Sequence, residues 1–417
     1  MKVLVVGEGA REHTVCWKFS RSNRLSGLFA APGNAGTLDL ATNLPKIEPN
    51  DVEAVTRFAV DSSIDLVFIG PEAPLAAGLV DALSAEGIAA VGPHAAASRL
   101  EASKAFAKSF MSSYNIPTAA YRSFSDGNEF EKYVRATRKR LVVKKSGLAG
   151  GKGVFEDEDP DILIANGRAI VDAKDEVIAE EFLTGSEVSI FALTDGSDYL
   201  MLPPCADYKK AGVGSTGPNT GGMGAVCPVP WITPEEMLQI DREIVAPTFR
   251  GMADAGIGYR GVLYFGLMIT TDGPRLLEYN VRFGDPEAQV LLPLLRADFT
   301  NWCEAIVHGS IGNFPAGYLE ASAVGVVIAA AGYPGSYQKG LTVSRLPSHP
   351  EDEAFVFHAS TAVRHGRLVT GGGRCFTAVG IGRELLNARS RAYSAARGIT
   401  FPGSWYRPDI GGRIFGS

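Results

Sequence analysis

With 417 residues, the chain is too long for one hydrophobic core and should divide into about three domains. Hydrophobic residues make up 46 % and charged residues 21 %, which excludes a disordered or fibrous protein. The net charge of −6 and the scattered basic residues argue against nucleic acid or an anionic membrane surface as a partner.

The sequence also gives no sign of a membrane span or a signal peptide. The longest apolar run, 324–332, is far shorter than the ~20 residues of a transmembrane helix, and the run at 3–6 is too short for a signal. The five cysteines are dispersed without zinc or redox spacing. We therefore expect a cytoplasmic protein that binds neither membrane nor nucleic acid.

Short β-branched runs alternate with helix-length segments over the first hundred residues. They predict strands over 2–6, 28–31, 66–69 and 88–91, the pattern of a Rossmann-like parallel α/β sheet. Each run ends in a glycine or proline turn, and such sheets bind ligands at the carboxyl ends of their strands. We predict an N-terminal α/β domain over 1–102 with a ligand site along this edge.

The rest of the chain predicts two further units. From residue 103 a helical, polar stretch to about residue 133 precedes a strand over 141–145 and then more closely spaced, hence antiparallel, strands. A small α+β unit with strands over 324–331, 354–358 and 375–380 and a helix over 383–397 ends the chain. The expected divisions are a middle domain over 103–318, with a small lid at about 118–185 and a larger part at about 186–318, and a C-terminal domain over 319–417.

The segment G-E-G-A-R-E-H at 7–13 follows the first predicted strand and looks like a dinucleotide fingerprint. Glu12 replaces the third glycine, and no acidic residue follows the second strand, so a nicotinamide site is disfavoured. The turn still exposes backbone N–H groups, and P-G-N-A-G at 32–36 could form a similar nest. Both turns suit a small phosphorylated ligand; two ordinary strand-to-helix turns are the alternative.

A strand ending in lysine runs into a glycine-rich loop in L-V-V-K-K-S-G-L-A-G-G-K-G-V at 141–154. Its backbone donors, together with Lys144 and Lys152, suit nucleotide phosphates. It is no Walker loop, because neither Ser nor Thr follows Lys152. A glycine-rich hairpin with exposed lysines is the alternative. Downstream, extended backbone over 180–187 could pair with an adenine edge while Glu187 accepts from ribose hydroxyls.

A predicted strand over 275–280 leads into N-V-R-F-G-D-P-E. Positions two apart share a face, so Glu278, Asn280 and Arg282 should project together, while residues 277, 279 and 281 face the core. Carboxylate and amide oxygens suit Mg²⁺ held jointly with phosphates, and Arg282 would be an anion clamp beside them. A strand with one polar face is the alternative.

The run G-S-T-G-P-N-T-G-G-M-G at 214–224, with D-Y-K-K at 207–210 before it, predicts a loop that can close over a reactive intermediate and exclude water. An exposed Ω-loop is the alternative.

Together these segments resemble the phosphoribosylamine–glycine ligase (glycinamide ribonucleotide synthetase) family of the ATP-grasp superfamily over nearly the whole chain. The motifs are G-x-G-x-R-E-H, A-P-G-N-A-G, I-G-P-E-A-P-L, S-K-A-F, G-L-A-G-G-K-G-V, E-E-F-L, T-G-P-N-T-G-G-M-G-A and N-x-R-F-G-D-P-E. The resemblance implies a nucleotide held between two sheets and a C-terminal domain that closes the active site. It also implies that glycine, 5-phosphoribosylamine and ATP give glycinamide ribonucleotide, ADP and phosphate through a glycyl phosphate, mainly by positioning and charge neutralisation.

The resemblance further implies a role for individual residues. ATP, as co-substrate, would be bound by Lys144, Gly150, Gly151, Lys152, Glu181, Leu183 and Glu187, and Mg²⁺ or Mn²⁺ by Glu278 and Asn280. The other substrates would be bound by Gly9, Asn34, Glu72, Asp207, Arg282, Gly284 and Asp285. Catalysis would depend on Arg282, Asp207 and Lys144. We expect a monomer or a weak homodimer.

The sequence departs from the family pattern in four places. Lys145 stands where Ala-Asp or Ala-Ser is usual, and its charge would either redirect phosphate contacts or point to the opposite face. An acidic stretch at 156–161 replaces a glycine-containing loop, so nucleotide covering should be looser. Glu8 replaces a smaller residue of the first turn, and 263–267 contains no acid for a second metal.

Two rival functions share parts of this pattern. An ATP-grasp ligase that carboxylates an aminoimidazole ribonucleotide would have the same nucleotide site but need bicarbonate; the G-D-P-E and T-G-P-N-T-G-G-M-G segments favour glycine. A nucleotide-binding regulatory protein without turnover is the rival from another class. The presence of Lys144, Glu278, Asn280 and Arg282 argues against it.

Overall fold

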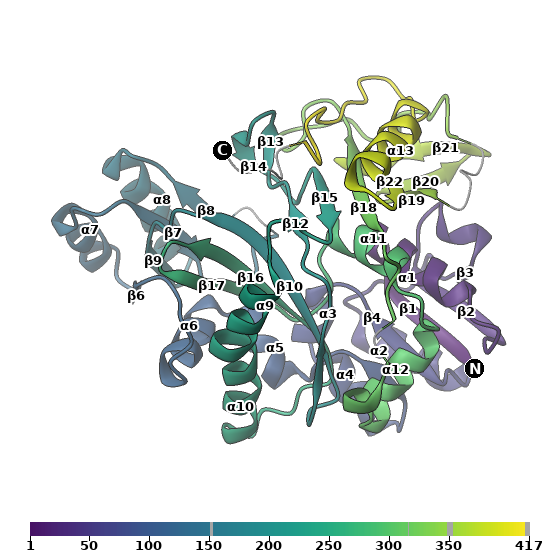
Figure 1. Cartoon of the computed structure of the whole chain (residues 1–417), viewed down its shortest axis with the longest axis horizontal. Coiled ribbons are helices and arrows are strands. Elements are labelled where there is room, and N and C mark those ends of the chain that lie inside the picture. The colour runs from purple at the N-terminus through teal and green to yellow at the C-terminus, as the bar shows by residue number, and fades with distance from the viewer. Residues whose placement is uncertain (151–152, 316, 348–352, 413–417) are drawn as a thin grey trace.

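The computed structural model describes residues 1–150, 153–315, 317–347 and 353–412. Figure 1 shows a body of packed sheets and helices, with the N-terminal part at the lower right, the C-terminal part at the upper right and one small unit projecting to the left. We call that small unit the lid. No helix in the described ranges has both the length and the apolar character needed to cross a membrane.

The N-terminal part forms the predicted parallel sheet. Its elements are β1 (Lys2–Gly7), α1 (Ala10–Ser20), β2 (Gly27–Pro32), η1 (Thr37–Asp39), β3 (Thr42–Asn43), α2 (Val52–Asp61), β4 (Leu66–Ile69), α3 (Glu72–Ala76), α4 (Leu79–Ala85) and β5 (Ala89–Val91). The strand order is β3-β2-β1-β4-β5, and every neighbouring pair is parallel. Val3 and Val5 pack on the α1 side, whereas Leu4 and Val6 pack on the α2 and α4 side, because side chains alternate along a strand. Helices on both faces explain the continuous apolar runs of this sheet.

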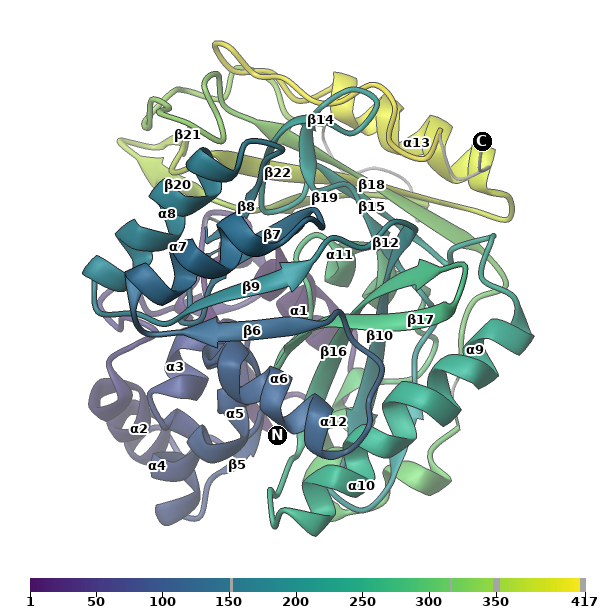
Figure 2. The ribbon, with the colours of Figure 1, turned by 90° about the vertical axis from the view of Figure 1, so that its left-hand side faces the viewer.

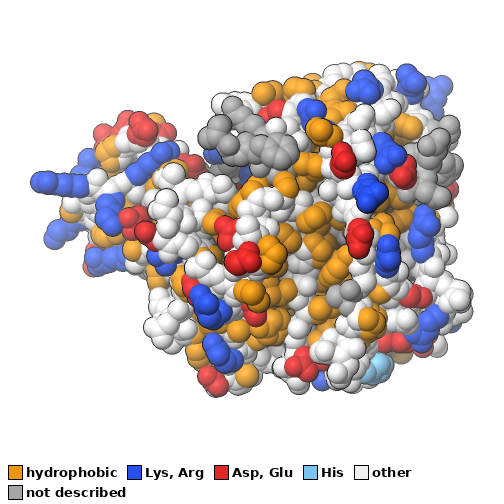
Figure 3. Space-filling view, in the orientation of Figure 1, with side chains coloured by type: hydrophobic (Ala, Val, Ile, Leu, Met, Phe, Trp, Pro, Cys, Tyr) orange, Lys and Arg blue, Asp and Glu red, His pale blue; other side chains and the backbone are white. Residues whose placement is uncertain are grey.

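The lid is a separate antiparallel layer with its own core. Two helices lead to it, α5 (Ala95–Ala102) and α6 (Lys104–Ser113), and it consists of β6 (Tyr121–Phe124), α7 (Gly127–Ala136), β7 (Leu141–Lys145), β8 (Val154–Glu156), α8 (Pro160–Asp172) and β9 (Val177–Glu181). The strand order is β6-β9-β7-β8. Gly167 allows α7 and α8 to approach, since a Cβ there would lie 2.1 Å from the ring of Phe130. Charged side chains of both signs cover the outer end of the lid (Figure 3), as expected of a solvent-facing surface.

The prediction of a helical stretch to about residue 133 is wrong over one segment. Residues 121–124 form β6, because they pair with β9, the last strand of the lid along the chain. Beyond that pairing, Thr118 bridges to Leu276, and the Leu276 N–H donates to the Pro117 carbonyl at 2.8 Å. The entrance of the lid therefore lies against the strand that carries Glu278.

The central sheet is antiparallel, as predicted. It has the order β11-β10-β16-β17 and consists of β10 (Ser186–Thr194), β11 (Tyr199–Met201), β16 (Gly261–Thr270) and β17 (Gly273–Asn280). The helical segment that precedes β16 is built from α9 (Pro234–Ile240), η2 (Asp241–Val245) and α10 (Ala246–Asp254). In Figure 2 this helical segment lies along the outer side of the sheet, on the opposite side from the lid. The lid and the central sheet are the two sheets that the resemblance leads us to expect in the middle domain.

The third sheet combines strands from distant parts of the chain. Its order is β12-β15-β18-β22-β19. The remaining elements are β12 (Ala206–Asp207), β13 (Lys210–Gly212), β14 (Thr216–Asn219), β15 (Gly224–Cys227), α11 (Glu287–Leu291), η3 (Leu292–Leu294), α12 (Phe299–His308), η4 (Ile311–Asn313), β18 (Ser322–Ala329), β19 (Ala354–His358), β20 (Thr361–Arg364), β21 (Arg367–Thr370), β22 (Arg374–Gly382) and α13 (Leu385–Arg397). Gly380 lets α13 lie directly on the sheet, because a Cβ there would be 2.2 Å from the Ala388 carbonyl oxygen. The expected combination of α/β and α+β units is confirmed, and the sheet continues across residue 319.

Candidate active site

A buried charge cluster lies where β7 meets β9. Lys144 and Lys108 each place Nζ 3.0 Å from Oε2 of Glu180. Lys108 also donates to Thr118 Oγ1 at 2.7 Å. Two ammonium groups share one carboxylate, so the cluster keeps one net positive charge where α6 meets the lid, which suits a phosphate.

Opposing effects fix the charges of this cluster. Burial raises the pKa of Glu180, but Lys144 and Lys108 outweigh burial and hold that pKa below its ordinary value. Burial lowers the pKa of Lys144, and attraction by Glu180 and Glu278 raises it above its ordinary value. Burial lowers the pKa of Lys108 to about 8 despite Glu180. All three groups are therefore charged at neutral pH.

The strand β17 carries Glu278 and Asn280. Its register against β16 shifts so that one residue, Leu277, has no partner opposite it, and alternation stops at such an irregularity. The prediction that Leu277 faces the core is therefore wrong, since the side chain is only half-buried. Tyr279 and Val281 are buried, as predicted.

The oxygens of Glu278 and Asn280 fit a hard cation. Burial raises the pKa of Glu278, but Lys209, Lys144 and other cations outweigh it, so the pKa lies below its ordinary value and the carboxylate is ionised. Asn280 Oδ1 accepts from Arg282 Nη2 at 3.1 Å. The described part of the chain holds no group of three or more His, Cys, Asp or Glu placed for a metal. A cation here would take its other ligands from phosphates and water, as Mg²⁺ commonly does.

The glycine-rich segment 206–224 brings further charges to this site. Lys209 Nζ lies 2.9 Å from Asp207 Oδ2. Glu287, at the start of α11, accepts from Ser189 Oγ at 3.1 Å. Burial and then Asp207 raise the pKa of Glu287 to about 7, although Lys209 lowers it. Besides the predicted Asp207, the structure thus places a second carboxyl group at this site, that of Glu287, which titrates near neutrality.

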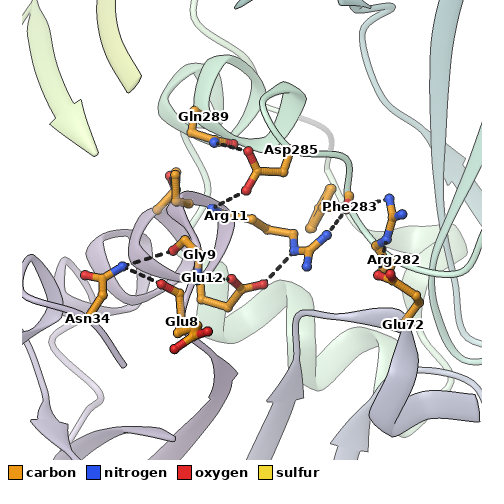
Figure 4. Close-up of polar contacts among 12 residues, drawn as sticks. Glu8, Gly9, Arg11, Glu12, Asn34, Glu72, Arg282, Phe283, Asp285 and Gln289 are labelled. Carbon is orange, nitrogen blue, oxygen red and sulfur yellow. Dashed lines mark hydrogen bonds and ion pairs between the residues drawn. The ribbon is translucent and has the colours of Figure 1, made fainter. Parts of the chain in front are cut away.

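Arg282 joins β17 to the N-terminal part of the chain. Its Nη2 lies 2.7 Å from Glu101 Oε1 and its Nε 3.2 Å from Glu72 Oε2, while Nη1 donates to the Phe283 carbonyl at 3.3 Å. Burial lowers the pKa of Arg282, but Glu101 and Glu72 raise it above its ordinary value. Most donors of the guanidinium group are thus directed at protein oxygens, which fixes its position between the two parts. Figure 4 shows Arg282 beside Glu72 and Phe283.

The first glycine turn is connected to the G-D-P-E turn (Figure 4). The Gly9 N–H donates to Glu12 Oε2 at 2.6 Å, and Glu12 Oε1 accepts from Arg11 Nε at 2.6 Å. Arg11 Nη1 donates to the Phe283 carbonyl at 3.0 Å, and the Arg11 N–H donates to Asp285 Oδ2 at 3.3 Å. Gly9 and Asp285, which the sequence places 276 positions apart, therefore lie on one surface.

Glu12 fills the space that a dinucleotide fingerprint leaves open. A Cβ at Gly70 would lie 2.0 Å from Glu12 Oε1, and a Cβ at Gly7 would lie 2.5 Å from Glu12 Cγ. Both glycines thus make room for a buried carboxylate, which supports the sequence argument against a nicotinamide site.

Asn34 lies beside the first turn, but its amide contacts backbone. Its Oδ1 accepts from the N–H groups of Gly36 at 2.8 Å and Thr37 at 3.2 Å. Its Nδ2 donates to the carbonyls of Glu8 at 2.8 Å and His358 at 2.9 Å. Asn34 therefore shapes the turn and connects it to β19.

Several other predicted residues line the two layers. Lys145 points away from Lys144 and pairs with Asp175 at 3.3 Å, which decides between its two expected orientations. The Glu181 carboxylate lies 2.8 Å from Lys139 Nζ. Leu183 is half-buried after β9.

The remaining predicted residues lie at turns or strand ends. Glu187 is exposed at the start of β10. Gly150 has φ +54°, and Gly284 lies where a Cβ would be 2.3 Å from Glu287 Oε2. The predicted ATP ligands Gly151 and Lys152 fall outside the described residues.

Sequence reasoning did not assign five residues that contact this network. Three had a usable signal, and two of these stand beside motifs: Glu180 opens the E-E-F-L motif, and Arg374 follows three consecutive glycines. Lys108 and Glu101 lie in ordinary helical sequence and gave none. Glu287 is the last residue of G-D-P-E, where its charge could have marked it.

Known proteins are similar to this chain over nearly its full length. Family models described as phosphoribosylglycinamide synthetase match in three parts: the N domain at 1–101, the ATP-grasp (A) domain at 102–288 and the C domain at 323–413. The phosphoribosylamine–glycine ligase of Agrobacterium fabrum is 45 % identical over 99 % of this chain and 98 % of its own. The trifunctional purine biosynthetic protein adenosine-3 of Gallus gallus is 43 % identical over 99 % of this chain and 42 % of its own.

Solved structures show the same architecture. The crystal structure of phosphoribosylamine–glycine ligase from Thermotoga maritima superposes with a TM-score of 0.86 at 33 % identity, covering 98 % of this chain and 100 % of that one. The biotin carboxylase domain of the Hydrogenobacter thermophilus 2-oxoglutarate carboxylase, at 17 % identity and a TM-score of 0.74 over 97 % of this chain and 91 % of that one, shares the fold alone. The chain therefore belongs to the phosphoribosylglycinamide synthetase family.

Proposed function

We propose that this protein is an ATP-dependent ligase that joins glycine to 5-phosphoribosylamine in purine biosynthesis, giving glycinamide ribonucleotide, ADP and phosphate. Family membership over the whole chain supports the reaction. The observation that carries it is that Lys144 lies on the lid and Glu278 on β17 of the central sheet, the strand against which the lid begins at Thr118. This pair can hold a triphosphate together with its cation.

The nucleotide would lie between the lid and the central sheet. Its phosphates would contact Lys144, Gly150, Gly151 and Lys152, and its nucleoside Glu181, Leu183 and Glu187. Glu278 and Asn280 would hold Mg²⁺ or Mn²⁺, which the ionised carboxylate and the amide oxygen fit. When bound, the cation would offset the charge of the phosphates.

The proposed chemistry needs no nucleophile from the protein. A glycine carboxylate oxygen attacks the γ-phosphorus, the bond to ADP breaks, and glycyl phosphate forms. The nitrogen of 5-phosphoribosylamine then attacks the acyl carbon, phosphate leaves, and the nitrogen releases a proton. The protein contributes position and compensating charge: Lys144 on the phosphates, Asp207 and Arg282 beside the joining substrates.

The phosphoribosylamine would lie along the surface that joins the first turn to the G-D-P-E turn. Gly9, Glu72, Gly284 and Asp285 would line it directly. Asn34 would act through the backbone that its amide holds, because both ends of that amide already contact main-chain groups.

The domain division and the setting of the enzyme remain part of this proposal. We infer domains over 1–102, 103–318 and 319–417, with the lid at about 118–185 and the larger part at about 186–318. The third sheet would make the middle and C-terminal domains move together, since β15 of the middle domain pairs with β18 of the C-terminal domain. A cytoplasmic monomer or weak homodimer completes the proposal.

The test is a reconstituted reaction with each component omitted in turn. Purified protein is given ATP, Mg²⁺, glycine and 5-phosphoribosylamine generated in place, and glycinamide ribonucleotide, ADP and phosphate are quantified. We expect equal amounts of the three products, and none when any substrate or the cation is omitted. ADP formation that ignores glycine, or that needs bicarbonate instead, would overturn the proposal.

A further inference from the structure

A single arginine of the third sheet contacts two loops of the candidate site. Arg374, the first residue of β22, directs Nη1 at the carbonyls of Gly221 (2.5 Å), Asp285 (2.7 Å) and Gly222 (3.4 Å). The same nitrogen lies 3.3 Å from Asp285 Oδ1. Its side chain is 22 % exposed. The contacts with Gly222 and Asp285 are partly buried, whereas the contact with Gly221 lies at the surface.

A tyrosine from the same corner contacts the backbone N–H of Gly221, while Arg374 contacts its carbonyl. The Tyr333 hydroxyl accepts from the Gly221 N–H at 3.0 Å. The Tyr333 ring packs on Gly373, the residue before Arg374, because a Cβ on Gly373 would lie 2.2 Å from that ring. Gly222, with φ +108°, lies against Pro286, where a Cβ would be 2.5 Å from the proline ring.

These contacts connect all three parts of the site. On the loop side, the Thr220 N–H donates to the Lys209 carbonyl at 2.7 Å, and Lys209 pairs with Asp207. On the turn side, Asp285 Oδ2 accepts from the Arg11 N–H of the first turn. Displacing one guanidinium group would therefore loosen the loop over Asp207 and the turn beside the first glycine motif together.

We propose that Arg374 and Tyr333 are positioning residues that hold the glycine-rich loop at 214–224 against the G-D-P-E turn and so shield the acyl phosphate from water. The inference rests on the proposed function. Neither residue touches reacting atoms; both act through the backbone of Gly221, and Arg374 also through that of Asp285. Water that reaches the acyl carbon yields glycine and phosphate, so a loosened loop converts part of the ligase reaction into net ATP hydrolysis.

The ratio of phosphate to glycinamide ribonucleotide measures this leak. Arg374→Met removes all contacts of the guanidinium group, Arg374→Lys keeps a single charged donor, and Tyr333→Phe removes one hydroxyl. Arg383→Met, at an exposed position of the same unit, is the matched control. Phosphate and ribonucleotide are measured in the same samples, together with the KM for ATP.

Wild type and Arg383→Met should give one phosphate per ribonucleotide. Arg374→Met should at least double that ratio and lower the kcat for ribonucleotide by roughly one to two orders of magnitude, as misplaced positioning groups do. The KM for ATP should stay within about twofold, since Lys144 and Glu278 are untouched. Tyr333→Phe should raise the ratio less than Arg374→Met, and Arg374→Lys should lie between Arg374→Met and wild type.

A ratio of one in every variant, or a KM for ATP that rises together with the loss of kcat, would overturn the inference. If Arg374→Met does not fold, Arg374→Lys and Tyr333→Phe decide by the same ratio. Failure of the wild-type protein to form ribonucleotide would instead refute the proposed function, so the two outcomes are distinguishable.

Discussion

Replacing Glu180 by glutamine should destabilise the protein more than removing Lys108, which shares the same carboxylate oxygen. Lys108 and Lys144 each lie 3.0 Å from Glu180 Oε2, in a site where the side chains of Lys108 and Glu180 are only 2 % exposed. Glutamine keeps the size of the side chain but raises the net charge of the cluster from +1 to +2. Lys108→Met lowers it to zero and leaves the Lys144 pair intact.

The magnitude follows from the unpaired charges. Breaking a buried ion pair from one side costs about 3–5 kcal/mol, because the remaining charge is left without a partner. Lys108 keeps its contact with Thr118 and, with a pKa already lowered to about 8 by burial, can release its proton. We therefore expect the lower end, about 3 kcal/mol of unfolding free energy for Glu180→Gln and roughly half as much for Lys108→Met.

Urea unfolding of wild type, both single variants and the double variant measures these costs. The double variant should lose clearly less than the sum of the single variants, since removing Lys108 relieves the repulsion that glutamine creates. Calorimetric titration with ATP should show weaker binding to Glu180→Gln, because Lys144 is no longer held. A loss below about 1 kcal/mol for Glu180→Gln, or strictly additive losses, would refute the shared-charge account.

Three further predictions concern single groups. Glu278→Ala should lower ligase turnover by roughly two to three orders of magnitude while the circular dichroism spectrum is unchanged, and near-normal turnover would refute the metal assignment. Burial lowers the pKa values of His13 and His358 to about 3 and about 4. In the unfolded chain these histidines have the ordinary pKa of 6.5 and take up protons below it, whereas in the folded protein they stay neutral to lower pH. As the pH falls from about 6 to 4.5, the pair should therefore remove about 2 kcal/mol of unfolding free energy per pH unit. Melting curves check this, and an unchanged pH slope in His13→Gln would contradict it. Lys145→Ala should leave the KM for ATP within about twofold, because exposed pairs contribute little, whereas Lys144→Ala should raise it at least tenfold in the same kinetic assay; equal effects would contradict the orientations seen here.

Many strands of the sheets could be predicted, because a buried strand is a local run of apolar, often β-branched residues. The run at 354–358 coincides with β19, and the run at 66–69 with β4. Contacts within one motif could be predicted too: Asn280 and Arg282 lie side by side, as strand alternation required.

What could not be predicted depends on partners far away in the chain. Residues 121–124 form a strand only because β9 lies beside them. Glu101 contacts Arg282, which lies 181 positions further along the chain. The helical sequence around Glu101 would look the same without that contact. Likewise the shift beside Leu277 arises from the pairing of two strands, which the sequence of one strand cannot reveal.

Asn34 shows a different limit. It lies beside the first motif, yet its amide is directed at six main-chain groups. Sequence indicates which residue types lie near a ligand, whereas only the geometry separates a ligand contact from the support of a turn.

The most direct test of the account is the position of Mn²⁺ in a crystal grown with a non-hydrolysable ATP analogue. We predict an anomalous scattering peak coordinated by Glu278 and Asn280, with the triphosphate reaching from that peak to Lys144. A peak away from β17, or phosphates that lie far from Lys144, would contradict the claim that the lid and the central sheet hold the nucleotide between them.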